Sequence, residues 1–250
     1  MSAGALGQFV IEPRAHGPLR LRHALGMFTS PGAVFARIED TGAYGWALVT
    51  LLFLVLAIGY AQVQTGLIDQ EVDRHTEKTL AELEASQGHL LDQVELSDQL
   101  ESARKSAEFK KTISRLLVIV AAPAYFLASF LLIASFLYAV VALTGTKPEY
   151  HTLMSICVYA GFIELAAYAL QLAMMLCFRT TQVSTTLGML AEPGKPSILP
   201  AIDPFRIWFW VLVAMGLIIT HQLSRRMAVF ICALFCALST GVRMAALALT

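Results

Sequence analysis

Polar side chains inside the apolar stretches of the second half of the chain are the residues best placed to do chemistry. Glu164, Tyr168 and Gln171 share one helical face in the stretch 153–178, and Arg243 lies toward the end of another apolar stretch. A charge at the centre of a bilayer costs at least roughly 2.5 to 3.5 kcal/mol, so each charged group needs a partner or a wet pocket. We expect Glu164 and Arg243 either to pair across two helices or, for Arg243, to reach the outer surface.

The same residues allow a second interpretation, in which they line a polar path for an ion or a lipid. Glu164, Tyr168, Gln171 and Tyr159 are the candidates for such a path, although Tyr159 falls about 140° away from Glu164 around a helix. A purely structural ion pair is the simpler interpretation of the two charges.

Other reactive side chains lack the spacing that catalysis or metal binding requires. The four cysteines fall inside apolar runs without CxxC spacing and are most simply packing residues: Cys157, Cys177, Cys232 and Cys236. No phosphate loop, GxSxG elbow or HExxH motif is present. We therefore predict no enzymatic activity, no cofactor and no metal.

Composition indicates that most of the chain is dissolved in lipid. The 250 residues are 57% hydrophobic and 14% charged, against roughly a quarter charged in soluble domains. A span needs roughly 20 apolar residues, which predicts an all-α, polytopic bundle of five transmembrane helices. They are expected at 45–63, 116–143, 153–178, 207–223 and 227–249. A formal net charge of zero argues against nucleic acid as a partner.

The distribution of basic residues predicts the orientation of the bundle. The first 44 residues carry several arginines and no signal peptide, so the first apolar stretch is expected to be an uncleaved anchor. Placing that segment, Lys147 and the Arg225–Arg226 pair in the cytoplasm puts the amino terminus inside and the carboxyl terminus outside.

A charged segment at 64–114 separates the first two predicted spans. It contains no proline, and apolar residues recur in it at helical spacing: Val72, Thr76, Leu80 and Leu83, then Leu96, Leu100, Ala103 and Ala107. This pattern predicts an extramembrane helical hairpin with a break near Gly88, projecting on the order of 30 Å. The hairpin is either a docking arm for a partner protein or a solvated linker.

Two proline signatures mark further helix starts. Ser30 and Pro31 begin a short amphipathic helix, which either lies in the membrane interface or leads the chain into the first span. Asp203 and Pro204 begin the fourth span in the same way.

Small residues recur every four positions in the last predicted span, at Ala233, Ala237, Gly241 and Ala245. Small side chains let helix backbones approach closely, so this face is expected to pack on another helix, in this chain or in a second subunit.

Several short motifs occur in a familiar order. They are Pro31-Gly32-x-Val34-Phe35-x-x-Ile38, Gly145-x-x-Pro148, Tyr159-Ala160, and Asp203-Pro204-Phe205-x-x-Trp208 followed by Gly216-Leu217. From about Arg22 to Ala246 the chain resembles bacterial members of the Yip-domain family. The resemblance implies a five-span fold with a cytoplasmic amino terminus, in a bacterial inner membrane, and it supplies no catalytic residues. Eukaryotic Yip proteins are membrane partners of Rab GTPases in vesicle traffic.

Two features depart from the family pattern, namely the length of the hairpin and the presence of Glu164. We divide the chain into an amino-terminal segment, 1–44, and a five-span Yip-like domain, 45–250, that includes the hairpin at 64–114. The expected function is that of a membrane scaffold or partner-binding subunit, in contact with lipid, a protein partner and possible further copies of itself. The alternative is a transport or lipid-moving protein with a polar path around Glu164.

Overall fold

The computed structural model describes residues 21–41, 44–87, 93–181, 183–190 and 198–249, and these residues are helical or lie in short connections. The helices are α1 (Leu21–Thr29), α2 (Pro31–Thr41), α3 (Gly45–Gln64), α4 (Leu67–Gln87), α5 (Gln93–Leu143), α6 (Tyr150–Phe178), α7 (Pro204–Thr220) and α8 (Arg225–Leu249). Two 3-10 helices, η1 (Leu187–Leu190) and η2 (Leu199–Ala201), lie between α6 and α7. The predicted all-helical class is confirmed.

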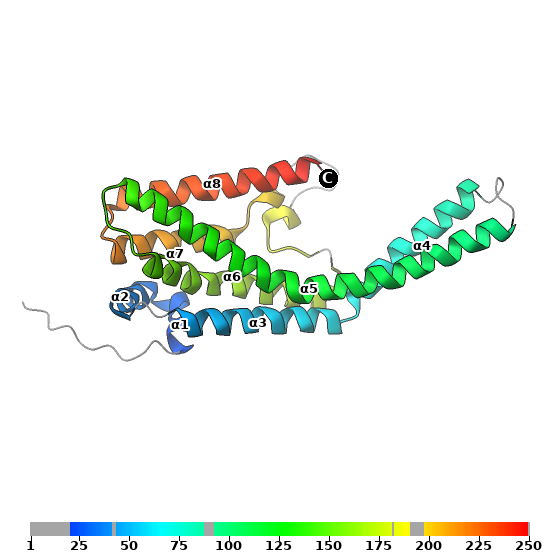
Figure 1. Cartoon of the computed structure of the whole chain (residues 1–250), viewed down its shortest axis with the longest axis horizontal. Helices are drawn as coiled ribbons and strands as arrows, with labels where there is room; N and C mark the ends of the chain where they lie inside the picture. Colours follow the sequence, from blue (N-terminus) through cyan, green and yellow to red (C-terminus); the bar gives the residue numbers. More distant parts are fainter. Residues whose placement is uncertain (1–20, 42–43, 88–92, 182, 191–197, 250) are drawn as a thin grey trace, which may run out of the picture.

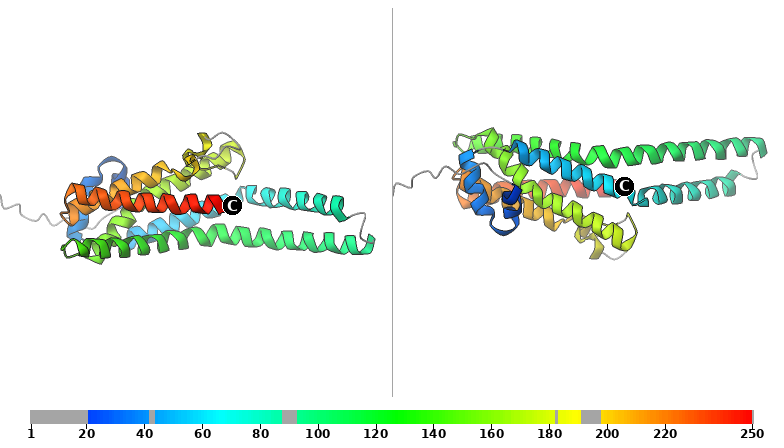
Figure 2. Two further views of the ribbon diagram at one scale, coloured as in Figure 1. Left: turned by 90° about the horizontal axis from the view of Figure 1, so that it is seen from above. Right: turned by 90° about the horizontal axis from the view of Figure 1, so that it is seen from below.

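Helices α3, α5, α6, α7 and α8 form a bundle along the long axis of the molecule, with α1 and α2 at one end and the α4–α5 hairpin extending from the other (Figures 1 and 2). Within the described residues, four helices are long and apolar enough to cross a membrane, by length and composition: α3, α5, α6 and α8. The apolar helix α7 is shorter, with 17 residues. The molecule therefore has the architecture of a multi-pass membrane protein.

Helix α5 joins the hairpin to the bundle without a break. It has 51 residues and continues through Pro123, which removes one backbone donor from its interior. The second arm of the hairpin and the second predicted span are therefore one helix, rather than two elements meeting near Leu116.

Helix α6 forms the centre of the bundle. Its residues from Thr152 to Ile163 are all buried, with α3, α5 and α7 against it. A helix that is apolar on every side is typical of such a central position. Gly161 provides the space for its neighbours: a Cβ atom there would lie 2.3 Å from Cζ of Phe130 and 3.2 Å from Cδ1 of Leu51.

The amphipathic helix predicted after Ser30 begins at Pro31 as expected, but its apolar face contacts protein. Val34, Phe35 and Ile38 are buried in the core, and α2 packs on α7 and α6. A preceding helix, α1, which the sequence pattern did not predict, packs on α2 and α6. Of the two interpretations, the structure favours a helix that closes the bundle at the start of α3.

The predicted cap of α7 is present. The side chain of Asp203 accepts a hydrogen bond from the backbone N–H of Phe205 at 3.0 Å, and Pro204 occupies the first turn. Between α6 and α7 the chain is held in part by a backbone hydrogen bond of 2.9 Å from Leu187 to Ile202. This connection lies at the same end of the bundle as the hairpin (Figure 1).

Replacing Gly161 with alanine tests whether α6 depends on this close approach. Alanine is the better helix former by about 1 kcal/mol, yet we expect Gly161→Ala to lower stability by about 1 to 3 kcal/mol, because Phe130 and Leu51 are fully buried and must move. Thermal unfolding in detergent measures this. The matched control is Gly241→Ala, where a Cβ atom meets nothing within 4 Å. Equal melting temperatures for the two variants would contradict the packing argument.

Candidate functional site

A cavity of about 410 Å³ lies among α5, α6, α7 and α8 at the hairpin end of the bundle. The four polar candidates from the sequence, Glu164, Tyr168, Gln171 and Arg243, all line it. The remaining lining residues are Ala121, Ala122, Tyr125, Phe126, Ala167, Thr185, Asp203, Phe205 and Arg206. We call this space the interhelical cavity.

Glu164 forms an ion pair with Arg206, from the first turn of α7. The side chains of Glu164 and Arg206 are 13% and 15% exposed, so both charges are largely removed from solvent. The Arg206 guanidinium also lies 5.3 Å from the ring of Phe209 and 5.8 Å from that of Trp210, within the range of cation–π contacts.

The expected pairing of Glu164 with Arg243 is wrong. Arg206 was not predicted, because the fourth span was expected to begin at Ile207, one residue after Arg206. The cap at Asp203 was the available signal, since it starts α7 at Pro204 and brings Arg206 into the first turn. Phe209 and Trp210, three and four residues on, then lie on the same helical face as Arg206.

Arg243 faces a different carboxylate in the same cavity. Its Nη1 atom lies 3.7 Å from Oδ2 of Asp203, while Oδ1 of Asp203 caps α7. The Arg243 side chain is 42% exposed and that of Asp203 is 14% exposed. At this distance the pair has an electrostatic attraction without a hydrogen bond.

The two uncharged candidates, Tyr168 and Gln171, donate hydrogen bonds to residues outside α6. Tyr168 donates a hydrogen bond of 3.0 Å to Oε1 of Gln62, which is buried near the end of α3. Gln171 donates one of 3.3 Å to the carbonyl oxygen of Val183. Sequence reasoning missed Gln62, which was counted only as part of an apolar stretch.

Tyr159 does not line the interhelical cavity, so its predicted place in a polar path is wrong. It is fully buried, and its hydroxyl meets no hydrogen-bond partner among the residues that the structure describes. The physical reason is its angle of about 140° from Glu164 around α6. The cavity also ends at Glu164, because its lining includes no α6 residue closer to the opposite end.

The charges of the cavity balance. Two carboxylates, Glu164 and Asp203, face two guanidiniums, Arg206 and Arg243. Such a site suits a ligand that carries both signs of charge. Among the described residues, no group of three or more His, Cys, Asp or Glu side chains could hold a metal ion.

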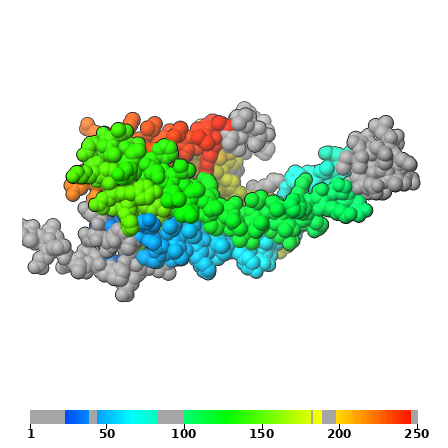
Figure 3. Space-filling view, viewed as in Figure 1, coloured from blue at the N-terminus to red at the C-terminus, as the bar shows by residue number. Residues whose placement is uncertain are grey.

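The hairpin is held together by a small-residue seam and by ion pairs. Ala107 of α5 is buried and Ala103 half-buried, and on α4 the half-buried residues are Val72, Thr76 and Leu80, so this part of the predicted seam is confirmed. The side chains of Leu83 and Leu96, and Gly88, lie outside the described residues. The α4 and α5 arms project as one rod from the bundle (Figure 3).

Two ion pairs join the arms of the hairpin near the bundle. Arg115 donates hydrogen bonds of 2.8 and 2.6 Å to the two carboxylate oxygens of Asp69. Lys111 Nζ lies 2.7 Å from Oδ1 of Asp73. The hydrogen bonds from Arg115 lower the pKa of Asp69 below its ordinary value of 3.8.

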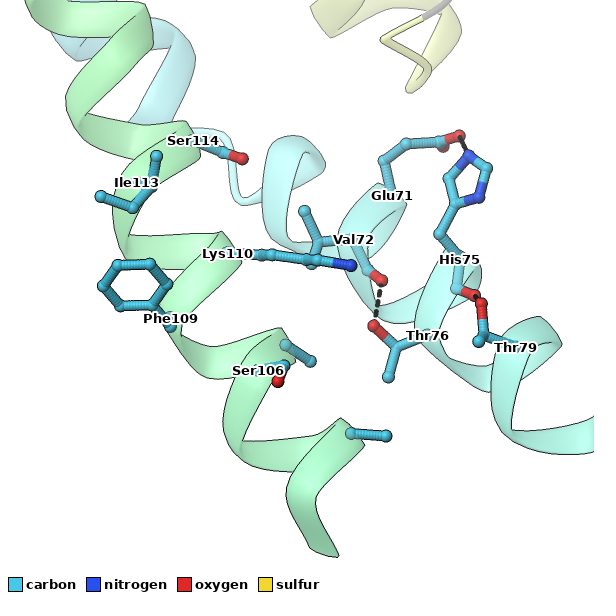
Figure 4. Close-up of a pocket in the computed structure, with 12 residues that line it drawn as sticks. Glu71, Val72, His75, Thr76, Thr79, Ser106, Phe109, Lys110, Ile113 and Ser114 are labelled. Carbon is cyan, nitrogen blue, oxygen red and sulfur yellow. Dashed lines mark hydrogen bonds and ion pairs between the residues drawn. The ribbon is translucent and has the colours of Figure 1, made fainter. Parts of the chain in front are cut away.

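A groove of about 500 Å³ lies between the two arms of the hairpin. Figure 4 shows Ser106, Lys110 and Ser114 pointing from α5 toward Val72 and Thr76 of α4. Phe109 and Ile113 point away from α4 and form the outer edge of the groove (Figure 4). We call this space the hairpin groove.

The small-residue ladder of α8 does not pack on another helix of this chain. Ala233, Ala237, Gly241 and Ala245 are all exposed, and α8 contacts α7 through other residues, including Ile231 and Cys232. A contact of the ladder with a second subunit stays a prediction.

A family model of the Yip1 domain matches residues 25–246, which include the bundle and the hairpin. The chain belongs to the Yip1 domain family. Members of this family are generally non-enzymatic membrane proteins. No curated protein and no solved structure matches this Yip1 domain.

Removing the carboxylate of Glu164 is expected to destabilise the Yip1 domain. Glu164→Gln leaves Arg206 charged, largely buried and unpaired, which costs about 3 to 5 kcal/mol. The control is Glu101→Gln, which breaks an exposed pair with Lys105 worth less than about 1 kcal/mol. Thermal unfolding in detergent compares the two variants. A similar small drop in melting temperature in both would show that the Arg206 guanidinium is hydrated when Glu164 is removed.

The ion pair at the base of the hairpin gives a pH dependence. Because the folded-state pKa of Asp69 is lowered, its stabilisation is present above the ordinary pKa and is lost as pH falls through the lowered value. Hydrogen exchange in α4 should therefore be unchanged, after correction for intrinsic rates, from pH 8 to 5 and rise only below about pH 4. Asp69→Asn should show the raised exchange at every pH. A transition near neutral pH in the native protein would contradict this assignment.

Proposed function

We propose that the protein is an integral membrane scaffold whose hairpin binds a helix of another membrane protein. The observation that most supports this proposal is an apolar stripe on α5 that continues from the bundle onto the hairpin. Its members are spaced three or four residues apart and are exposed: Phe109, Ile113, Leu116 with Leu117, and Val120. We call these residues the α5 stripe.

The hairpin end of this stripe is surrounded by charged residues, as expected for a segment in water. Phe109 is 68% exposed, and it is flanked by Glu108, Lys110 and Lys111. A large aromatic side chain that is exposed among charges indicates a contact surface more than a lipid-facing one. Lipid can cover the Val120 end of the stripe but not the Phe109 end. A partner that covers the whole stripe must therefore be a membrane helix that continues beyond the bilayer.

The hairpin groove supports the same partner. Its floor is formed largely by small residues, including Ala103, Ser106 and Ala107, which allow a third helix to approach the two arms closely. Its rims carry opposite charges, with Glu71 on α4 and Lys110 on α5. A helix with an apolar stripe between a basic and an acidic edge complements this arrangement.

Site-specific photo-crosslinking tests the proposal in native membranes. A benzophenone amino acid at Phe109 should give one adduct with a protein that has a transmembrane helix. The same probe at Arg104, which is exposed and lies about 140° around α5 from Phe109, should not. Ile113→Asp should abolish the adduct by placing a charge in the stripe, whereas the neighbouring Thr112→Asp, also exposed, should preserve it.

Three results would overturn the proposal. Equal adducts from positions 104 and 109 would indicate random collision. Lipid adducts at position 109 would place the stripe inside the bilayer. An adduct of twice the mass of the chain would make the occupant a second copy, as expected for a homo-oligomer.

The proposed topology has five spans, because α7 is added to the four long apolar helices as the fourth span along the chain. At 17 residues α7 is about 26 Å long, close to the hydrocarbon thickness, and it lies against α6 and α8. We propose a bacterial inner membrane with the amino terminus in the cytoplasm, which places the hairpin and the carboxyl terminus outside. The support for this orientation is the positive-inside distribution of Lys147, Arg225 and Arg226.

Transport through the interhelical cavity has less support than the scaffold role. Beyond Glu164 the α6 residues back to Thr152 are buried and mostly apolar, which offers no continuation for a polar path. The balanced charges at one end of the bundle suit a binding site more than a conduit.

A further inference from the structure

The interhelical cavity opens sideways between α5 and α8. Near the α1–α2 end these helices meet, with ring centroids of Phe136 and Phe235 6.0 Å apart, and toward the hairpin they diverge in the view of Figure 1. Tyr125 on α5 is 57% exposed and Arg243 on α8 is 42% exposed along its side chain. The mouth of the cavity therefore faces the lipid around the bundle.

The cavity lies at the depth of lipid headgroups. Arg243 comes 18 residues after Arg225, the first residue of α8, which places it about 27 Å farther along the helix. With Arg225 at the opposite membrane surface, this is close to the hydrocarbon thickness of about 30 Å. Asp203 and Arg206 lie at the same end, at the start of α7.

The polar groups of the cavity match a phosphate next to a primary ammonium. Among the described residues, the contact of Arg243 with Asp203 is a loose one of 3.7 Å, so its guanidinium donors can turn to a phosphodiester oxygen. Asp203 and Glu164 supply carboxylate oxygens for an ammonium group, and the exposed ring of Tyr125 offers it a cation–π face.

We propose that the interhelical cavity binds the headgroup of a zwitterionic aminophospholipid, phosphatidylethanolamine, from the surrounding leaflet. Its phosphate lies on Arg243, and its ammonium lies among Asp203, Glu164 and Tyr125. The acyl chains leave through the mouth and run toward the membrane interior along exposed apolar residues, Leu132 on α5 and Leu238 on α8. This site is separate from the hairpin groove and does not depend on the scaffold role.

The charge balance predicts selectivity among headgroups. Phosphatidylglycerol has no cation for the two carboxylates, and its negative charge would lie close to them. Phosphatidylcholine has a cation without N–H donors, so the carboxylates would lose hydrogen bonds they can make to a primary ammonium. The expected order of affinity places phosphatidylethanolamine first.

Native mass spectrometry of the whole protein in detergent, titrated with the three lipids of equal chain length, measures this order. Arg243→Gln should weaken phosphatidylethanolamine binding by about tenfold, the value of one charge-assisted hydrogen bond. Arg226→Gln, an exposed arginine at the other end of the same helix, should not change it. Asp203→Asn keeps a good helix cap and should reduce the preference for phosphatidylethanolamine over phosphatidylglycerol.

The Asp203→Asn variant keeps the test independent of folding, because its readout is the ratio of two lipids bound to the same molecules. Equal retention of the three lipids by the native protein would overturn the proposal. So would equal losses in Arg243→Gln and Arg226→Gln, since both results mean general lipid coating. Soluble glycerophosphoethanolamine should compete only weakly, and binding as tight as that of the lipid would instead assign the cavity to a soluble phosphate compound.

Discussion

The ion pair between Glu164 and Arg206 determines much of the arrangement at the hairpin end of the bundle. A carboxylate within a central membrane helix, removed from solvent, needs a partner at hydrogen-bonding distance. The partner comes from the first turn of α7, so the start of α7 has to lie beside the middle of α6. That requirement fixes where the connection after α6 returns, and it brings Asp203 into the same space. Arg243 of α8 then meets a second carboxylate, and a balanced polar cavity results.

The opposite end of the molecule is organised mainly by apolar packing. There α6 is buried on every side, with Gly161 admitting the ring of Phe130. Helices α1 and α2 cover this end with their apolar residues turned inward. The molecule therefore has a tightly packed closed end and a polar open end, and both proposed binding surfaces belong to the open end.

Local patterns in the sequence predicted most of the helices and their boundaries. The proline and aspartate signatures placed the starts of α2 and α7, because a helix cap depends on neighbouring residues only. The spacing of four residues identified the hairpin seam for the same reason. Pairings between distant helices could not be predicted in this way. Glu164 had two arginines within reach of a plausible bundle, and the choice of Arg206 depends on how α7 packs on α6, which no local pattern encodes.

The members of the candidate site were predicted in part, and its connections were not. Glu164, Tyr168, Gln171 and Arg243 were recognisable because polar side chains are rare in apolar stretches. Asp203 and Phe205 were noticed only as parts of a helix start, and Gln62 gave no signal at all. The exposed ladder on α8 shows a limit of such patterns, since small residues indicate that close approach is possible without showing whether the helix that uses it belongs to the same chain or to a second subunit.

The continuity of α5 has a mechanical consequence. One helix, about 77 Å long at 1.5 Å per residue, carries the α5 stripe at one level and the cavity residues Tyr125 and Phe126 at the next. Pro123 lies between these levels, where a missing backbone hydrogen bond makes bending easiest. Because α5 is continuous, a partner that tilts the hairpin also changes the position of the α5 residues that line the cavity. By thermodynamic reciprocity, a ligand that moves α5 away from α8 shifts the angle of the hairpin, and that angle changes the affinity of the ligand by the same coupling free energy.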